Sequence, residues 1–270
     1  MIQIASDNDY IILDFSQSRL QPHTLLCNSM LKTVNLNHIA VQIKDVLNQA
    51  INQSISYEKF LEELLKCEIQ GREEKRFEKR LKHAAFPEYK TLDEFDLKEQ
   101  PTLSKKQFNQ LRELSWIEQG YNLILLDPTG VGKTFFSIGL GIEAINCGYK
   151  VHFITMHDLI HVLKTQDILR TSKTKYKRII DSDLIIIDDL MFLAMKKNKA
   201  NLFFQLINKL YGQSSIIITS NKGPEDWGEL LGDPAITTAI LDRIVHKCQV
   251  LNLDGESYRL KHRQTIFGNN

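Results

Sequence analysis

The spacing of apolar residues predicts a helical region in the first third of the chain. Between residues 57 and 69, apolar side chains recur mostly at steps of three and four, the period of an amphipathic helix. Ser56 stands before them as a candidate N-cap, and the apolar residues are Tyr57, Phe60, Leu61, Leu64, Leu65 and Ile69. We expect a small α-helical domain over residues 30–85 with this stripe packed against protein. Residues 1–29 lack a sustained period and form an unassigned extension.

Residues 105–270 follow a different rhythm, in which short β-rich runs alternate with helix-length segments. The runs are 123–126, 151–155, 184–187, 215–219 and 250–253. Strands separated by helices pair in parallel and are covered on both faces, so we expect an α/β domain with a parallel sheet between two helical layers. Residues 86–104 contain two prolines and little periodicity, which indicates a connector.

Composition and charge exclude several classes of protein. The 34 Lys and Arg residues nearly balance 33 Asp and Glu residues, so any nucleic-acid binding must use local clusters of charge. The four cysteines form no CxxC pair, which argues against a zinc site or a disulfide framework. The start carries acids where a signal peptide would carry Lys or Arg, and no apolar run reaches the roughly 18 residues of a membrane helix. We expect a cytoplasmic protein with no membrane partner.

The sequence DPTGVGKT, residues 127–134, lies between a predicted strand and a predicted helix, as a phosphate-binding P-loop requires. Its glycines let backbone N–H groups close around phosphate oxygens, Lys133 would neutralise the outer phosphates, and the Thr134 hydroxyl would ligate Mg²⁺. We predict that ATP binds at Thr129, Gly130, Val131, Gly132, Lys133 and Thr134. Asp127 stands where the motif usually opens with glycine, so either nucleotide binding is weakened or the Asp127 carboxylate points outward.

Two further strands predict polar groups at the same edge of the sheet. In DLIIIDDL, residues 183–190, a buried strand would deliver Asp188 to hold Mg²⁺ and Asp189 to orient the attacking water. An ordinary core strand that ends in a solvated turn is the alternative. The strand SIIITSN ends at Asn221, which could hold the same water or sense the γ-phosphate, although turn residues are common after any strand.

A basic helix face is a candidate for DNA contact. On a helix over residues 71–82, with about 100° per residue, one arc of about 160° is wholly basic. It contains Arg72, Lys75, Arg76, Lys79, Arg80 and Lys82. These side chains would contact the phosphate backbone of DNA, and a solvated face with ion pairs along the helix is the alternative.

At this point the chain resembles a known family. Residues 81–261 are similar to the IstB-like ATPases of insertion sequences, AAA+ proteins related to the DnaC helicase loaders. The matching stretches are RLKHAAFPEYKTLDEFD, DPTGVGKT, GYKVHFITMHDLI, LIIIDDL, NLFFQLINKLYGQSSIIITSN, EDWGELLGDPAITTAILDRI and GESYRLK. The resemblance implies a P-loop AAA+ domain that binds ATP and Mg²⁺.

The resemblance also implies roles for individual residues. Arg243 matches the family's arginine finger, which would reach the ATP of a neighbouring subunit and implies a homo-oligomer. Arg259 matches an arginine near the nucleotide. By analogy with AAA+ proteins, a basic segment before the acidic strand would be a loop that tracks DNA, and a solvated loop is the alternative. Its basic residues are Lys173, Lys175, Lys177 and Arg178.

The predicted function is that of an ATP-dependent DNA-binding helper for transposition, which assembles on DNA and recruits or stimulates a transposase. A DnaC-like loader of a replicative helicase and a small-molecule kinase with the same loop are alternatives. A nucleotide-binding module with impaired hydrolysis is a third. Asp127 and Asp189 favour this third function, because many relatives carry the longer Glu where Asp189 stands. Met191 also departs from the family pattern, in place of a glycine.

Overall fold

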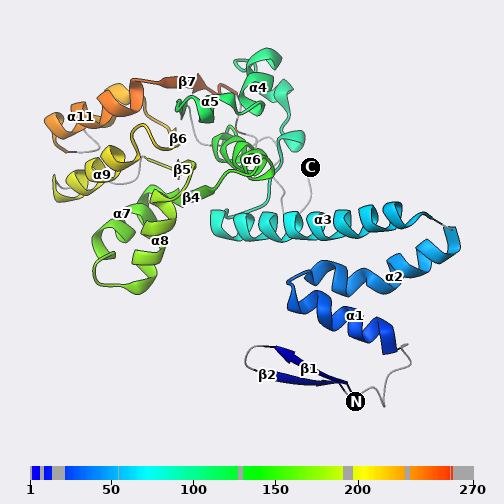
Figure 1. The fold of residues 1–270 in the computed structure, drawn as a ribbon. Coiled ribbons are helices and arrows are strands. Elements are labelled where there is room, and N and C mark those ends of the chain that lie inside the picture. Colours follow the sequence, from blue (N-terminus) through cyan, green and yellow to red (C-terminus); the bar gives the residue numbers. More distant parts are fainter. Residues whose placement is uncertain are drawn as a thin grey trace, which may run out of the picture. The chain divides into compact units, whose positions relative to one another are not determined.

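The chain divides into two units, residues 1–76 and 77–270. The structure is a computed structural model that describes residues 2–6, 9–13, 22–53, 55–126, 130–190, 197–228, 232–255 and 257. The first unit begins with an antiparallel hairpin of β1 (Ile2–Ser6) and β2 (Asp9–Leu13) (Figure 1). Its helices are α1 (Pro22–Thr33), α2 (Asn37–Gln53) and α3 (Tyr57–Ala84), and α3 continues into the second unit.

Only part of the predicted apolar stripe of α3 is covered. Ser56 accepts a hydrogen bond from a backbone N–H in the first turn, which confirms this residue as the N-cap. Phe60 and Leu64 are half-buried, whereas four residues of the stripe are exposed. The exposed residues are Tyr57, Leu61, Leu65 and Ile69. The chain itself therefore covers only part of the stripe, because helical period shows which residues share a face but not which protein covers that face.

A buried carboxylate joins α3 to α2. Glu68 is 3% exposed, and its carboxylate accepts hydrogen bonds from the backbone N–H groups of His38 and Ile39 at 2.9 and 3.0 Å. Arg72 Nε donates to the same carboxylate at 2.8 Å. Burial raises the pKa of Glu68, but Arg72 and the two N–H groups outweigh burial and hold the pKa below its usual value. Gly71 lies within α3, and its lack of a side chain makes room for His38, since a Cβ there would collide with the His38 ring.

The second unit is built on a five-stranded parallel sheet with the strand order β4-β5-β6-β3-β7. The strands are β3 (Asn122–Leu126), β4 (Val151–Thr155), β5 (Leu184–Asp188), β6 (Ser215–Ser220) and β7 (Cys248–Asn252). Each predicted run contributes to one of them, so the expected parallel sheet is confirmed. Because all five strands point the same way, their carboxyl ends meet at one edge.

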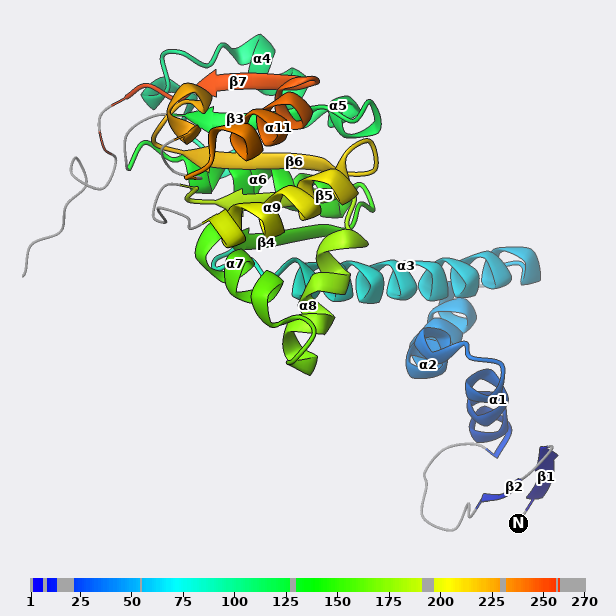
Figure 2. The same ribbon diagram turned by 90° about the vertical axis from the view of Figure 1, so that its left-hand side faces the viewer.

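Successive side chains along each strand point to opposite faces of the sheet, and they pack into two hydrophobic cores, one on each face. Leu123 and Leu125 pack on one face with α4 (Lys105–Arg112), α5 (Ser115–Glu118) and α6 (Lys133–Asn146). Ile124 packs on the other face with α7 (Met156–Thr165), α9 (Lys197–Leu210) and α11 (Pro234–Val245). Figure 2 shows α9 and α11 on the near face and α6 behind the sheet. The predicted helical layers on both faces are thus present.

Two segments expected to be irregular are ordered elements. The basic segment before β5 is the helix α8 (Arg170–Ile180), so the expectation of a loop there is wrong. The connector contains the 3₁₀ turns η1 (Leu92–Glu94) and η2 (Leu97–Glu99), and the Phe95 ring packs 5.0 Å from the Phe136 ring of α6. A further 3₁₀ turn, η3 (Pro224–Asp226), follows β6. Among the described residues, no helix is long and apolar enough to cross a membrane.

We expect the substitution Glu68→Gln to destabilise the helical unit by about 1–3 kcal/mol, because it weakens a buried acceptor that serves Arg72 and two backbone N–H groups. Chemical denaturation followed by circular dichroism measures this change. Glu62→Gln is the matched control on the solvent face of α3, where ion pairs with Lys59 and Lys66 are exposed. Equal losses of stability in the two variants would contradict a special role for Glu68.

Candidate nucleotide site

The glycine loop after β3 has the backbone that phosphate binding requires. Gly130 and Gly132 have φ angles of 96° and 99°, a left-handed region that favours glycine. Helix α6 begins at Lys133, so its N-terminal N–H groups face the loop. A Cβ at Gly132 would lie 3.4 Å from the Phe95 ring, and one at Gly130 would collide with Ser257. Asp127 and Thr129 lie outside the described residues.

Lys133 is placed beside the end of β6. This lysine is 8% exposed, and its Nζ donates a hydrogen bond to Asn221 Oδ1 at 2.8 Å. The P-loop lysine and the polar residue after β6 are therefore brought together, as the sequence predicts. The carbonyl of Val131 faces the connector, where it accepts a hydrogen bond from Gln100 Nε2 at 2.6 Å. Sequence patterns did not single out Gln100, because this contact joins residues that are 31 positions apart.

A hydroxyl and a carboxylate meet where the predicted metal would bind. Asp188 Oδ1, at the end of β5, accepts hydrogen bonds from Thr134 Oγ1 at 2.9 Å and from Thr219 Oγ1 at 2.7 Å. In the described part of the chain, no group of three or more His, Cys, Asp or Glu residues could hold a metal. Mg²⁺ commonly takes only one or two protein ligands and completes its shell with phosphate oxygens and water, so Thr134 and Asp188 fit Mg²⁺ bound to a nucleotide.

Asp189 has a left-handed backbone conformation and a carboxyl group with a raised pKa. Its φ angle is 59°, and its backbone N–H donates to Thr219 Oγ1 at 2.8 Å. Burial raises the pKa of Asp189, the nearby Asp188 carboxylate raises it further, and Lys133 partly offsets both effects. Thr219 thus contacts both acids, a role that its place in the apolar run did not reveal.

The predicted arginine finger lies away from this cluster. Arg243, in the last turn of α11, donates from Nε to Asn208 Oδ1 at 3.0 Å and packs over the Phe204 ring, both on α9. It also lines a pocket of about 310 Å³ together with Asn122 and Ser214, at the amino ends of strands. The phosphate loop therefore lies at the carboxyl ends of the strands, whereas Arg243 lies near their amino ends. Arg259 lies outside the described residues.

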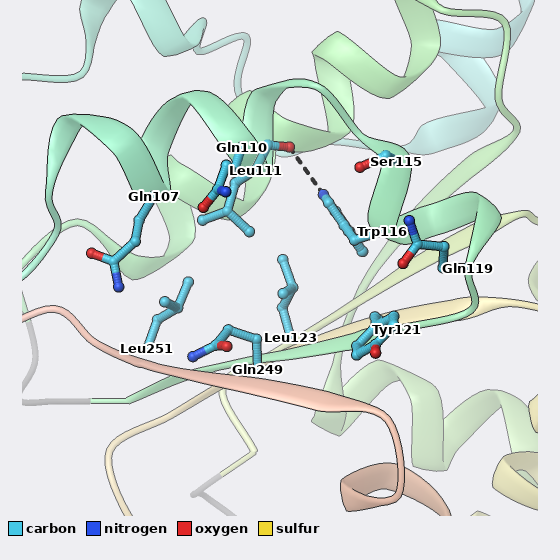
Figure 3. Close-up of a pocket in the computed structure, with 10 residues that line it drawn as sticks. All are labelled: Gln107, Gln110, Leu111, Ser115, Trp116, Gln119, Tyr121, Leu123, Gln249 and Leu251. Atoms are coloured by element: carbon cyan, nitrogen blue, oxygen red, sulfur yellow. Dashed lines mark hydrogen bonds between the residues drawn. The ribbon is translucent and has the colours of Figure 1, made fainter.

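A second pocket, of about 240 Å³, lies beside β3 and β7 (Figure 3). Leu111, Trp116, Leu123 and Leu251 give it an apolar lining, and glutamines surround this lining. None of its lining residues carries a charge, so it lacks the groups that a triphosphate requires.

The basic residues of α3 differ in their surroundings. Arg72 is held by Glu68 and by the Asn35 carbonyl, which makes it a structural residue of the helical unit. Near the end of α3, burial lowers the pKa of His83, and the positive charges of Arg178 on α8 and of Lys79 and Lys82 on α3 lower it further. The C-terminal end of α3, which carries part of the first basic cluster, lies beside α8, which carries the second (Figures 1 and 2). The other predicted DNA contacts also lie on these two helices; they are Lys75, Arg76, Arg80, Lys173, Lys175 and Lys177.

Comparisons with known proteins agree with this geometry. The family model "IstB-like ATP binding protein" matches residues 29–266. The ATP-binding protein of an IS21-like insertion sequence from Bacteroides fragilis is 38% identical over 236 residues, which are 87% of this chain and 90% of that protein. Its counterpart in insertion sequence IS21 of Pseudomonas aeruginosa is 38% identical over 87% of this chain and 89% of its own length. The DnaI structure is similar in fold, with a TM-score of 0.51 and 18% identity over 61% of this chain and 91% of DnaI. The predicted α/β fold with a parallel sheet is thus shared with DnaI.

We expect Thr219→Val to lower the affinity for ATP by about tenfold when Mg²⁺ is present, because the variant loses a hydrogen bond to a charged carboxylate. Titration calorimetry with Mg²⁺ and with EDTA measures the effect. Thr237→Val removes another buried threonine hydroxyl, which donates to the Asp233 carbonyl, and serves as the matched control. An equal loss with Mg²⁺ and with EDTA would show that Thr219 does not support a metal site.

Proposed function

We propose that this chain, which belongs to the IstB-like ATP-binding protein family, is an ATP-dependent helper of transposition that binds DNA and acts on a transposase. The observation that carries the nucleotide part is the meeting of four side chains at one edge of the sheet. Lys133 contacts Asn221, and Thr134 contacts Asp188. Insertion-sequence relatives that share most of this chain's length support the transposition part.

The residues of the site divide the work on the nucleotide among them. When bound, ATP would supply the γ-phosphoryl group that is transferred to water, and Mg²⁺ would neutralise negative charge on the phosphates. Backbone N–H groups of Gly130 to Lys133 bind phosphate oxygens, and the Lys133 ammonium neutralises their charge. Thr134 and Asp188 would hold the metal, and Asn221 and Asp189 would orient the attacking water. We expect hydrolysis to be slower with Asp at position 189 than with Glu, because the Asp side chain is one methylene shorter and holds the water less close to the phosphate.

DNA binds the joined basic surface of α3 and α8, which consists of Lys79, Arg80, Lys82, Lys175 and Arg178. The C-terminal end of α3 lies beside α8 in Figures 1 and 2. Lys79, Lys82 and Lys175 are exposed. No ion pair is present at these five residues in the described part of the chain, whereas Lys59 and Lys66, earlier in α3, are paired with glutamates. Unpaired cations can neutralise phosphates and release counterions.

Assembly into a homo-oligomer completes the site. Arg243 lies at the opposite edge of the sheet from the phosphate loop, so it serves the nucleotide of a neighbouring subunit. The exposed apolar residues of α3, Tyr57, Leu61, Leu65 and Ile69, give the N-terminal helical region of residues 30–85 a surface for protein contacts.

We expect Lys133→Ala to weaken ATP binding at least about tenfold, because the phosphates lose a charge-assisted contact. Asp189→Asn should retain ATP binding but slow DNA-stimulated hydrolysis by about 10²-fold or more. Calorimetry and phosphate release, measured with and without duplex DNA, separate the two effects. A wild type that binds ATP without exceeding the Lys133→Ala background would be a nucleotide-binding module and not an ATPase. Absence of ATP binding in the wild type overturns the proposed function.

We expect the double variant Lys79→Glu/Lys175→Glu to bind duplex DNA more weakly at low salt. The slope of log affinity against log salt should become shallower by about 2, since each lost phosphate contact removes about 0.9. Fluorescence anisotropy at several salt concentrations measures both quantities. Lys105→Glu/Lys106→Glu makes the same change in charge at exposed positions on α4 and is the control. Identical slopes in both double variants would exclude this surface from the DNA interface.

A further inference from the structure

The side-chain amide of Gln100 is held in one orientation beside the phosphate loop. Gln100 is 5% exposed, and its Nε2 donates to the Val131 carbonyl at 2.6 Å. A carbonyl can only accept a hydrogen bond, so the NH₂ group must face Val131 and the amide cannot be reversed. Oε1 therefore points away from the loop. This oxygen is buried, and no donor in the described part of the chain reaches it.

Two segments far apart in sequence form the surroundings of this amide. Thr102, just after Gln100, donates from Oγ1 to the Asn252 carbonyl at 2.5 Å and accepts from the Asp254 N–H at 3.2 Å. Gly255 then passes so close that a Cβ there would lie 2.7 Å from the Glu99 carbonyl oxygen. The connector and the segment after β7 thus flank the loop together, on the side where Gln100 contacts it.

A buried acceptor without a donor is costly, and native proteins rarely leave one without a reason. Gln100 is hydrogen-bonded to the loop that is predicted to hold the triphosphate. The base of a bound nucleotide is linked to that triphosphate through the ribose, so an N–H group of the base could donate a hydrogen bond to Gln100 Oε1. Adenine carries an exocyclic amine, which donates hydrogen bonds. Guanine and hypoxanthine carry a carbonyl at the same position, which would face the Gln100 carbonyl oxygen as a second acceptor.

The geometry points to Gln100 as the residue that recognises the nucleotide base, with Oε1 accepting from the adenine amine while Nε2 holds the Val131 carbonyl. This inference rests on the proposed binding of ATP at the loop. Because Oε1 is buried, the base can reach it only when the groups that cover this oxygen move aside. One side chain then contacts both the base and the phosphate loop, so the identity of the base affects the loop that binds the phosphates.

A cycle of ligand and protein changes tests this role. ATP and purine riboside triphosphate differ only by the exocyclic amine, and inorganic tripolyphosphate reports on the loop alone. Calorimetry with Mg²⁺ would measure all three ligands on the wild type, Gln100→Leu and Gln100→Glu. Gln110→Leu, on the neighbouring helix α4, is the control. Binding is the readout, so the test does not depend on hydrolysis.

We expect the wild type and Gln110→Leu to prefer ATP over purine riboside triphosphate by about tenfold, the effect of one hydrogen bond. Gln100→Leu should bind both nucleotides equally. Gln100→Glu keeps an acceptor for the amine but loses the donor to the Val131 carbonyl, so it should bind all three ligands more weakly and still prefer ATP. A uniform loss for all three ligands in Gln100→Leu, with the preference intact, would show that Gln100 only braces the loop and would overturn the inference.

If Gln100→Leu does not fold, the affinities of the wild type for the three ligands still test the inference. Equal affinities for ATP and purine riboside triphosphate overturn the role of Gln100 but leave the proposed function standing. Wild-type protein that binds neither nucleotide nor tripolyphosphate overturns both.

Discussion

The parallel pairing of β5, β6 and β3 is the constraint on which the candidate site depends. Ile187 pairs with Ile218 and Leu126 pairs with Ser220, so the three strands end in step. Asp188 and the phosphate loop consequently leave the sheet at the same edge. Both faces of these strands are buried, and a slip of one residue would turn Asp188 into a hydrophobic core. The packing of the cores therefore fixes the position of the polar groups.

Sequence patterns predicted the sheet and the main residues of the site, because buried parallel strands appear as short apolar runs and the loop has a distinctive spacing. The contacts of Gln100 and Thr219 could not be predicted, since each joins segments distant in sequence. Periodicity also failed on α3 and α8. On α3, periodicity identified the stripe that contains Leu61 and Leu65 but could not show that these side chains are exposed. On α8, the many basic residues suggested a loop, although the segment is a helix that buries Ile179.

The shape of the phosphate loop depends on its neighbours as well as on its glycines. Phe95 approaches Gly132 from the connector, and Ser257 approaches Gly130 from the segment after β7. The hydrogen bonds of Thr102 with that segment hold the two neighbours to each other. Movement of either segment would therefore change the contacts at Gly130 or Gly132. This arrangement provides a physical route by which nucleotide binding could alter surfaces outside the site, as the proposed switch on assembly requires.

The position of Arg243 explains why one chain cannot complete the proposed catalytic site. Its guanidinium packs on α9 and lines a pocket with Asn122 and Ser214, where strands begin, whereas the phosphate loop follows the ends of strands. Five residues of strand, at about 3.3 Å each, separate the two edges by about 16 Å. An arginine side chain cannot span that distance across a packed core, and the sheet is too rigid to bring its two edges together. The guanidinium of a second copy, docked with its amino edge against the carboxyl edge of the first, meets no such obstacle. Site completion and oligomer formation are therefore one requirement in the proposed function, because the sheet that aligns Asp188 and Lys133 also keeps Arg243 away from them.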